Sequence, residues 1–244
     1  MSTHRMTPGR DVLLSRRTAL SAGGILGGAA LLAACGNESG QGSNASSASS
    51  GSAAPASGTP VEHPEGLDYG TWLRPESHVL DAGGTQGVLV EFLDFECESC
   101  GAVFPIIEQV REEFAGELTY ALRYLPLDGH ANSRPAAHAA EAAARQGRLE
   151  EMYRQLFERQ AEWGEQEEGA VDDLFVEMAE TIGLDMEQWQ QDRASDAVAE
   201  RVEADVADAE KLRLTGTPSF FLDGEPFQPE SQEDLRSQIR EAIG

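Results

Sequence analysis

The feature that most constrains the fold of this chain is a pair of cysteines directly after an apolar run. Residues 88–95 are almost continuously apolar, which is typical of a central strand covered on both faces. Cys97 and Cys100 come next, and apolar residues then recur at helical spacing as far as Phe114, with Gly116 as a helix stop. The pattern predicts a strand and a helix with the cysteines at their junction.

The rest of the domain continues to alternate strand and helix signals. Residues 118–125 predict a second strand, and residues 131–213 have the apolar spacing of helices, with Gly183 as one helix stop. Residues 219–228 predict a hairpin, followed by a closing helix that Ser231 can cap. We therefore predict an α/β fold in which a helical insertion separates a strand-helix-strand half from a strand-strand-helix half.

The first 34 residues have the layout of an export signal. A basic segment precedes an apolar segment that is too short and too rich in glycine for a stable membrane-spanning helix. Arg16 and Arg17 lie in a sequence that resembles the twin-arginine export motif, although Ala19 stands where that motif usually has a bulky apolar residue. We expect twin-arginine export in preference to the general secretory route, which stays the alternative.

Residues 32–35 resemble the lipobox of bacterial lipoproteins, in which small residues precede a cysteine that receives the lipid. The resemblance implies that Cys35 is the first residue of the mature chain and carries acyl chains that anchor it in a membrane. Residues 35–60 then comprise the lipidated cysteine and a tether of Gly, Ser and Ala with too few bulky apolar groups to fold. The folded domain is expected to be residues 61–244.

The charge of the chain excludes one class of partner. It has 18 Lys and Arg against 43 Asp and Glu, a formal net charge of -25. Such a surface repels the phosphates of nucleic acids, so we expect no nucleic-acid partner. The charge favours solubility and says little about the fold.

The cysteine count limits what the pair can do. If Cys35 carries a lipid, Cys97 and Cys100 either bond to each other or stay free. Zinc needs two further ligands; the histidines show no paired spacing, but His130 and His138 stay open as ligands. A purely structural disulfide is a second alternative, although so tight a loop restrains the unfolded chain little. We therefore expect redox chemistry without a metal or other cofactor.

The predicted helix start gives the two thiols different roles. The unpaired N–H groups and the positive dipole end of a helix favour the thiolate of Cys97, and the thiolate is the species that attacks a disulfide. Cys100 lies one turn further into the helix and is expected to be more buried. It would act as the resolving thiol that releases a mixed disulfide.

Two segments, together with the cysteines, resemble the DsbA-like branch of the thioredoxin superfamily. They are residues 91–100, which contain the pair, and residues 216–221. The resemblance implies a thioredoxin-like fold with a helical insertion between its two halves. It also implies that Pro218 is a cis-proline opposite the sulfurs and that the backbone at Thr217 pairs with an extended substrate chain. X-Pro is the one peptide bond for which the cis form costs little.

The acidic residues around the cysteines divide into one that matches this family and others that depart from it. Glu91 matches a buried acid that accepts or relays the proton of the resolving thiol. The dipeptide between the cysteines is Glu98-Ser99, where strongly oxidising DsbA proteins have Pro-His, and Glu96 precedes the pair. Because carboxylates close to a thiolate oppose its charge, we hypothesise a less acidic nucleophile and a less oxidising disulfide than in the Pro-His type.

These features together imply an extracytoplasmic thiol-disulfide oxidoreductase, lipid-anchored at the outer face of the bacterial cell membrane. The expected partners are exported proteins with cysteine thiols or disulfides, and a membrane protein that resets the Cys97–Cys100 pair. An oxidase that forms disulfides is favoured because the cell exterior is oxidising. A tethered disulfide reductase, and a non-catalytic lipoprotein that binds peptides in the thioredoxin groove, stay as alternatives.

Overall fold

The computed structural model describes residues 70–81, 84, 86–167 and 169–244. The predicted export signal, the predicted lipidation site Cys35, the tether and the expected domain start at residue 61 lie outside the described residues. Within the described part of the chain, no helix is both long enough and apolar enough to cross a membrane.

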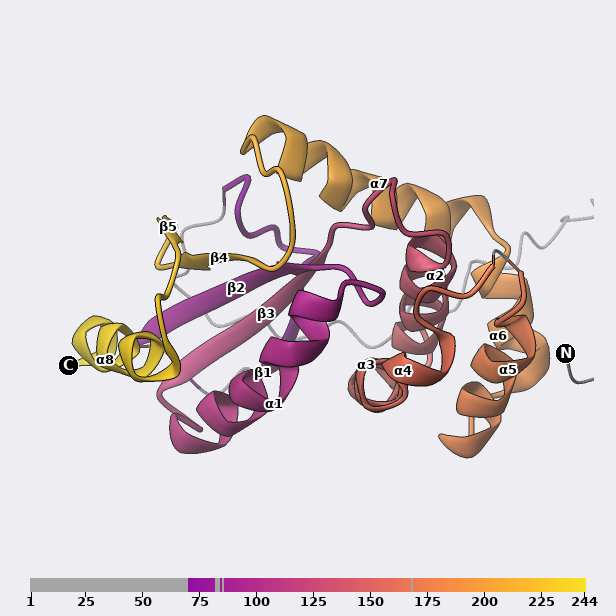
Figure 1. Cartoon of the computed structure of the whole chain (residues 1–244), viewed down its shortest axis with the longest axis horizontal. Helices are drawn as coiled ribbons and strands as arrows, with labels where there is room; N and C mark the ends of the chain where they lie inside the picture. Colours follow the sequence, from indigo (N-terminus) through magenta and orange to yellow (C-terminus); the bar gives the residue numbers. More distant parts are fainter. Residues whose placement is uncertain (1–69, 82–83, 85, 168) are drawn as a thin grey trace, which may run out of the picture. The chain divides into compact units, whose positions relative to one another are not determined.

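A five-stranded sheet with the strand order β1-β3-β2-β4-β5 carries the domain (Figure 1). Strands β2 and β3 are parallel, and the other neighbouring pairs are antiparallel. Every residue of β2 and β3 is buried, which confirms the central strand predicted within residues 88–95 and the second strand predicted within residues 118–125. The edge strand β1 had no clear sequence signal. The strands are β1 (His78–Asp81), β2 (Gly87–Leu93), β3 (Leu118–Tyr124), β4 (Ser219–Leu222) and β5 (Glu225–Phe227).

Two helices cover one face of this sheet. Helix α1 (Glu98–Glu113) connects β2 to the parallel β3, and helix α8 (Gln232–Ile243) closes the chain. Ile107 of α1 and Ile239 of α8 are both fully buried in one apolar cluster with residues of the strands. The Ser231 hydroxyl accepts a hydrogen bond from the Asp234 N–H at 3.1 Å, so the predicted cap of α8 is confirmed.

The predicted helical insertion lies between β3 and β4. Its buried side chains form one cluster with Leu93 and Phe95, at the end of β2 where the cysteine pair follows. The insertion therefore packs beside the start of α1, as Figure 1 shows for α3 and α4. Its helices are α2 (Ser133–Ala144), α3 (Leu149–Glu158), α4 (Gln160–Trp163), α5 (Asp172–Thr181), α6 (Met186–Arg193) and α7 (Asp196–Lys211).

Helix α7 is attached to the sheet through a buried cation. The Arg123 side chain of β3 is fully buried, and its guanidinium lies 2.5 Å from Asp205 and 2.9 Å from Asp208, both on α7. Buried charges of this kind are tolerated only when they are paired. The two ion pairs fix α7 on the face of the sheet opposite to α1 and α8, next to Val90 and Phe92.

The predicted hairpin of β4 and β5 is confirmed. Leu222 pairs with Glu225, and the two turn residues, Asp223 and Gly224, have φ values of 51° and 87°. Positive φ at both positions is the mark of a two-residue hairpin turn, and Asp and Gly are the residues that adopt it most readily. The Asp223 carboxylate also accepts a hydrogen bond from the Val88 N–H at 2.8 Å, which ties the turn to β2.

Candidate active site

Cys97 occupies the N-cap position of α1, where backbone N–H groups are free to stabilise a negative charge. The pKa of its thiol is lowered to about 5, chiefly by a hydrogen bond from the Cys100 thiol. Burial acts in the opposite direction, and the N–H groups of Ser99 and Cys100 add to the stabilisation of the thiolate. Cys97 is therefore a thiolate at neutral pH.

Cys100 has the opposite character. Its side chain is fully buried, and both thiols are free in this structure. Burial raises the pKa of the Cys100 thiol far above its ordinary value, and its hydrogen bond to Cys97 and the charge of Glu91 raise it further. The pair therefore consists of one ionised thiol at the helix start and one protonated thiol one turn further in.

The segment that carries Thr217 and Pro218 lies against the sulfur of Cys97. The peptide bond between them is cis, as the resemblance implied, and the Cys97 Sγ atom lies 3.4 Å from the Thr217 carbonyl oxygen. The buried Thr217 hydroxyl forms no hydrogen bond of good geometry with any of the described residues. It is nevertheless close enough to Cys97 to lower the pKa of that thiol. The two segments predicted to form the site, 120 residues apart, thus meet at one sulfur atom.

Glu91 lies on β2, on the same face as α1, and only 2% of its surface is exposed. Burial raises the pKa of its carboxyl to about 7, a hydrogen bond from the Tyr120 hydroxyl opposes this, and the charge of Cys97 adds to it. The Tyr120 oxygen is 2.6 Å from Glu91 Oε2. The charge of Glu91 also raises the pKa of the Cys100 thiol. The proton-relay role itself stays a prediction.

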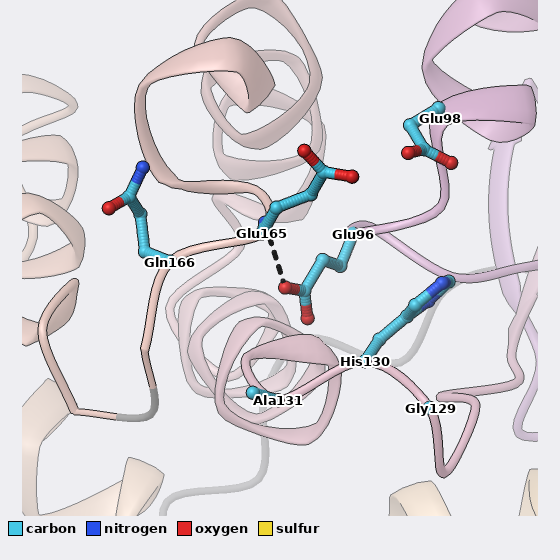
Figure 2. A pocket seen from close by; sticks show the side chains of 7 residues that line it. All are labelled: Glu96, Glu98, Gly129, His130, Ala131, Glu165 and Gln166. Carbon is cyan, nitrogen blue, oxygen red and sulfur yellow. Dashed lines mark hydrogen bonds between the residues drawn. The ribbon is translucent and has the colours of Figure 1, made fainter.

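Glu96 is buried, and its carboxylate is tied into the backbone. It accepts hydrogen bonds from the Asn132 N–H at 2.6 Å and from the Glu165 N–H at 3.1 Å. Figure 2 shows the Glu96 side chain directed toward Glu165 and away from the exposed Glu98. These contacts connect the active-site loop to the insertion. The predicted effects of Glu96, Glu98 and Ser99 on the reactivity of Cys97 stay predictions.

Asp94 and His130 form a pair that the sequence interpretation did not identify. His130 Nδ1 lies 2.6 Å from Asp94 Oδ2, and the fully buried Asp94 carboxylate also accepts from the Glu96 and Leu127 N–H groups and from the Ser133 hydroxyl. Burial alone would lower the pKa of His130, but Asp94 outweighs it and raises that pKa, with smaller contributions from Glu96 and Cys97.

A cavity of about 300 Å³ adjoins this pair (Figure 2). Glu96, Glu98 and His130 line it together with Glu165 and Gln166 of the insertion. Glu98 belongs to the first turn of α1, so the cavity lies next to the cysteine pair. Among the described residues, no group of three or more His, Cys, Asp and Glu side chains is arranged to hold a metal ion.

Gln160 of α4 supplies a second connection from the insertion to the site. Its amide nitrogen donates to the carbonyl oxygens of Phe95 at 2.7 Å and Cys97 at 2.9 Å. A Cβ atom on Gly101 would lie 2.1 Å from the Gln160 side chain, so the small residue after Cys100 makes room for this contact. The insertion thus holds the active-site loop through Gln160 and through the backbone groups that bind Glu96.

Comparison with known protein families agrees with a fold that places two cysteines at the start of a helix and a cis-proline beside them. A family model described as thioredoxin matches residues 75–241. The chain belongs to the thioredoxin family. Its fold is DsbA-like: the chain resembles α-DsbA1 from Wolbachia pipientis with a TM-score of 0.61 and 17% identity, covering 72% of this chain and 92% of that one. BdbD from Bacillus subtilis gives a TM-score of 0.59 and 20% identity over 68% and 92% of the two chains.

A thioredoxin-like oxidoreductase from Silicibacter pomeroyi DSS-3 is more similar in sequence than these two. It has 27% identity and a TM-score of 0.56, covering 69% of this chain and 91% of that one. Among curated proteins, the Na(+)/H(+) antiporter NhaA 1 of Mycobacterium sp. (strain KMS) is 40% identical over 167 residues, which are 66% of this chain and 26% of the antiporter. The matched part of this chain thus spans about a quarter of the length of such curated relatives.

Proposed function

We propose that this protein is an extracytoplasmic thiol-disulfide oxidoreductase that exchanges the Cys97–Cys100 disulfide with the thiols of exported proteins. The observation that carries this proposal is the opposite character of the two thiols. Cys97 ionises with a pKa of about 5, whereas burial keeps Cys100 protonated. One thiolate that attacks and one buried thiol that resolves are what two-step disulfide exchange requires.

The low pKa of Cys97 supports the oxidase direction. A stabilised thiolate favours the reduced form of the pair, and a disulfide whose reduced form is stabilised is the stronger oxidant. Thiol trapping in intact cells tests the direction. A pair found mostly as disulfide agrees with an oxidase, and a pair found mostly as dithiol would show that the protein works as a reductase.

We further propose that a lipid on Cys35 holds the domain at the outer face of the membrane, where a membrane protein resets the pair. The similarity to segments of Na(+)/H(+) antiporters supports a position beside a membrane. In cells, the Cys35→Ser chain should leave the membrane fraction while its exchange activity stays unchanged. Retention of that variant in the membrane fraction would contradict the lipid anchor.

The activity itself is tested with the full chain and two matched variants. The wild type should refold reduced ribonuclease oxidatively and reduce insulin in the presence of a thiol. Cys97→Ser should lose both activities, because the attacking thiolate is gone. Cys100→Ser should accumulate mixed disulfides, because the resolving thiol is gone. Activity that survives in Cys97→Ser, or no activity in the wild type, would contradict the proposed chemistry and favour a binding role for the groove.

A further inference from the structure

A buried tyrosine is the hydrogen-bond partner of Glu91. The Tyr120 hydroxyl donates to Glu91 Oε2 over 2.6 Å, and neither side chain is more than 2% exposed. In the sheet, Glu91 lies between Leu122 of β3 and Phe220 of β4, and neither of these side chains titrates. Tyr120 is therefore the group of the sheet that can pass a proton to or from this carboxyl.

A second buried tyrosine extends the contact. Tyr153 of α3 is fully buried, and it lies close enough to Tyr120 and Glu91 for both to affect the pKa of its hydroxyl. A tyrosine hydroxyl has one hydrogen to donate, and Tyr120 gives its hydrogen to Glu91, so any hydrogen bond between the two tyrosines must then have Tyr153 as its donor. Such a bond would add α3 to the observed link between Tyr120 and Glu91.

A cluster of ion pairs lies beside the Tyr120 ring. The Arg111 guanidinium lies 5.5 Å from the centre of the Tyr120 ring, and Arg111 pairs with Asp81, Glu108 and Glu150. These charged residues line a surface cavity of about 410 Å³. Charges of Glu108 and Arg111 also act on Tyr153. The side of the network away from the sulfurs therefore meets groups that can exchange protons with water.

We propose that Tyr120 holds and reprotonates Glu91 during thiol-disulfide exchange, and that Tyr153 extends this path toward the Arg111 ion pairs. Both are positioning residues, since neither touches the substrate or the reacting sulfurs. The inference rests on the proposed thiol-disulfide exchange and adds the route by which its proton moves.

The proton and electron balance of the oxidase step defines what this path does. A substrate thiolate attacks Cys97 Sγ, a new S–S bond forms to Cys97, and the Cys97–Cys100 bond breaks with its electron pair on Cys100. The protonated Glu91 carboxyl gives its proton to the Cys100 thiolate, which becomes a thiol. Glu91 is left as a carboxylate and regains a proton from the Tyr120 hydroxyl. Tyr120 in turn receives a proton from Tyr153, and the last proton in the series comes from water. In the reductase direction each proton moves the other way.

The expected pH dependence follows from the groups that face Glu91. These are Cys97 and Cys100 at the start of α1, Tyr120 on β3 and Tyr153 on α3. Opening of the disulfide by a thiolate should lose its assistance from Glu91 as the pH rises through the pKa of that group, about 7. The Tyr120 hydrogen bond lowers this pKa, so its removal should raise it by about one unit.

The experiment compares rates of disulfide opening by dithiothreitol in the oxidised full chain between pH 5 and 9, measured by acid quench and alkylation. Each rate is divided by the rate of the Glu91→Gln variant at the same pH. This ratio removes the pH dependence that comes from the ionisation of dithiothreitol itself. The wild-type ratio should fall with an inflection somewhat below the Glu91 pKa of about 7 in the dithiol form, because the disulfide lacks the Cys97 charge that helps to raise it. Tyr120→Phe should move that inflection upward by about one unit, and Tyr153→Phe by less, in the same direction. The Tyr120→Phe/Glu91→Gln chain should behave as Glu91→Gln alone.

Tyr124→Phe is the matched control. Tyr124 is equally buried on β3, but its hydroxyl donates to Glu141 at 3.3 Å, so the inflection should stay at the wild-type pH. Inflections that stay in place in both Tyr120→Phe and Tyr153→Phe, or that move equally in Tyr124→Phe, would overturn the proton path. A wild type that does not react with dithiothreitol at any pH would instead overturn the proposed exchange activity. If Tyr120→Phe does not fold, the inflection of Tyr153→Phe alone decides between these outcomes.

Discussion

Two regions next to the cysteine pair contain buried acidic side chains, and their surroundings differ. In the loop before α1, Asp94 and Glu96 each accept several hydrogen bonds, two of them in each case from backbone N–H groups. In the sheet, Glu91 accepts a hydrogen bond from a hydroxyl, that of Tyr120, and its pKa is raised to about 7 by burial. All three carboxylates are at most 4% exposed.

The difference shows that burial alone does not decide what a carboxylate does. Backbone N–H groups are fixed donors that stabilise the charged form, so Asp94 and Glu96 are suited to hold the loop to the insertion. A single hydroxyl compensates the loss of water less well, so Glu91 titrates in the range where proton transfer is useful. We expect loop substitutions to act mainly on stability and the sheet substitution to act mainly on pH dependence.

The largest stability effect is expected at Asp94. Asp94→Ala removes the acceptor of four groups, including two backbone N–H groups, and leaves these donors without a partner in a buried place. The free energy of unfolding should fall by about 3–5 kcal/mol, as for other broken buried charge networks. Denaturant titration of the oxidised chain measures this.

Asp128→Ala is the control for that measurement, because Asp128 lies in the same loop as His130 with a side chain that is 99% exposed. It should leave the free energy of unfolding almost unchanged. Similar losses in both variants would show that the loop is sensitive to any change and that Asp94 has no special role in holding it.

The next effect in size concerns Glu91 and the pH dependence of stability. Its folded pKa of about 7 exceeds the ordinary value of 4.5 for a glutamate, so its protonated form is favoured by folding. This contribution is fully present below pH 4.5 and is lost as the pH rises through 7. Relative to Glu91→Gln, the oxidised wild type should therefore lose stability between pH 4 and pH 8, by less than the roughly 3 kcal/mol of the full shift because the disulfide lacks the Cys97 charge.

Using the oxidised chain removes the titration of Cys97 from that comparison. Denaturant midpoints at five or six pH values give the two stability curves, whose difference isolates Glu91. A difference that does not change with pH would mean that Glu91 titrates at its ordinary pKa, and the contrast between sheet and loop would be lost.

A smaller effect is expected at Glu96. Glu96→Gln keeps one acceptor oxygen for the Asn132 and Glu165 N–H groups, so the loss of stability should be about 1–2 kcal/mol. The pKa of Cys97 should shift no more than in Glu98→Gln, whose side chain is exposed. Thiolate absorbance against pH measures this. A clear fall in the Cys97 pKa in Glu96→Gln would instead support the hypothesis that this carboxylate opposes the thiolate.

The sequence predicted the parts of the fold and site that local patterns encode. The buried runs of β2 and β3, the helical insertion and the turn at Asp223 each have a short-range signal, and all three are confirmed. The cysteine spacing and the proline after Thr217 marked the two segments that meet at Cys97. The four-residue strand β1 is too short to give such a signal.

Contacts between distant segments were beyond the sequence patterns. Asp94 and His130 are 36 residues apart, and no periodicity relates them. Tyr120 had the appearance of an ordinary strand residue, because nothing in its neighbourhood marks it as the partner of Glu91. An acid within an apolar run, as at Asp94, is the signal that was available, since a buried charge must have partners elsewhere in the chain.

The smallest predicted effect concerns His130, which belongs to the loop region but also senses the charge of Cys97. Because such coupling is reciprocal, a protonated His130 lowers the pKa of Cys97, and His130→Gln should raise that pKa by less than one unit. Thiolate absorbance of the reduced chain measures the shift, and His138→Gln serves as the control, since its surroundings are Arg134, Arg193 and Glu141. An unchanged Cys97 pKa in His130→Gln would confine the Asp94–His130 pair to holding the loop, and the two regions would then be fully separate in function.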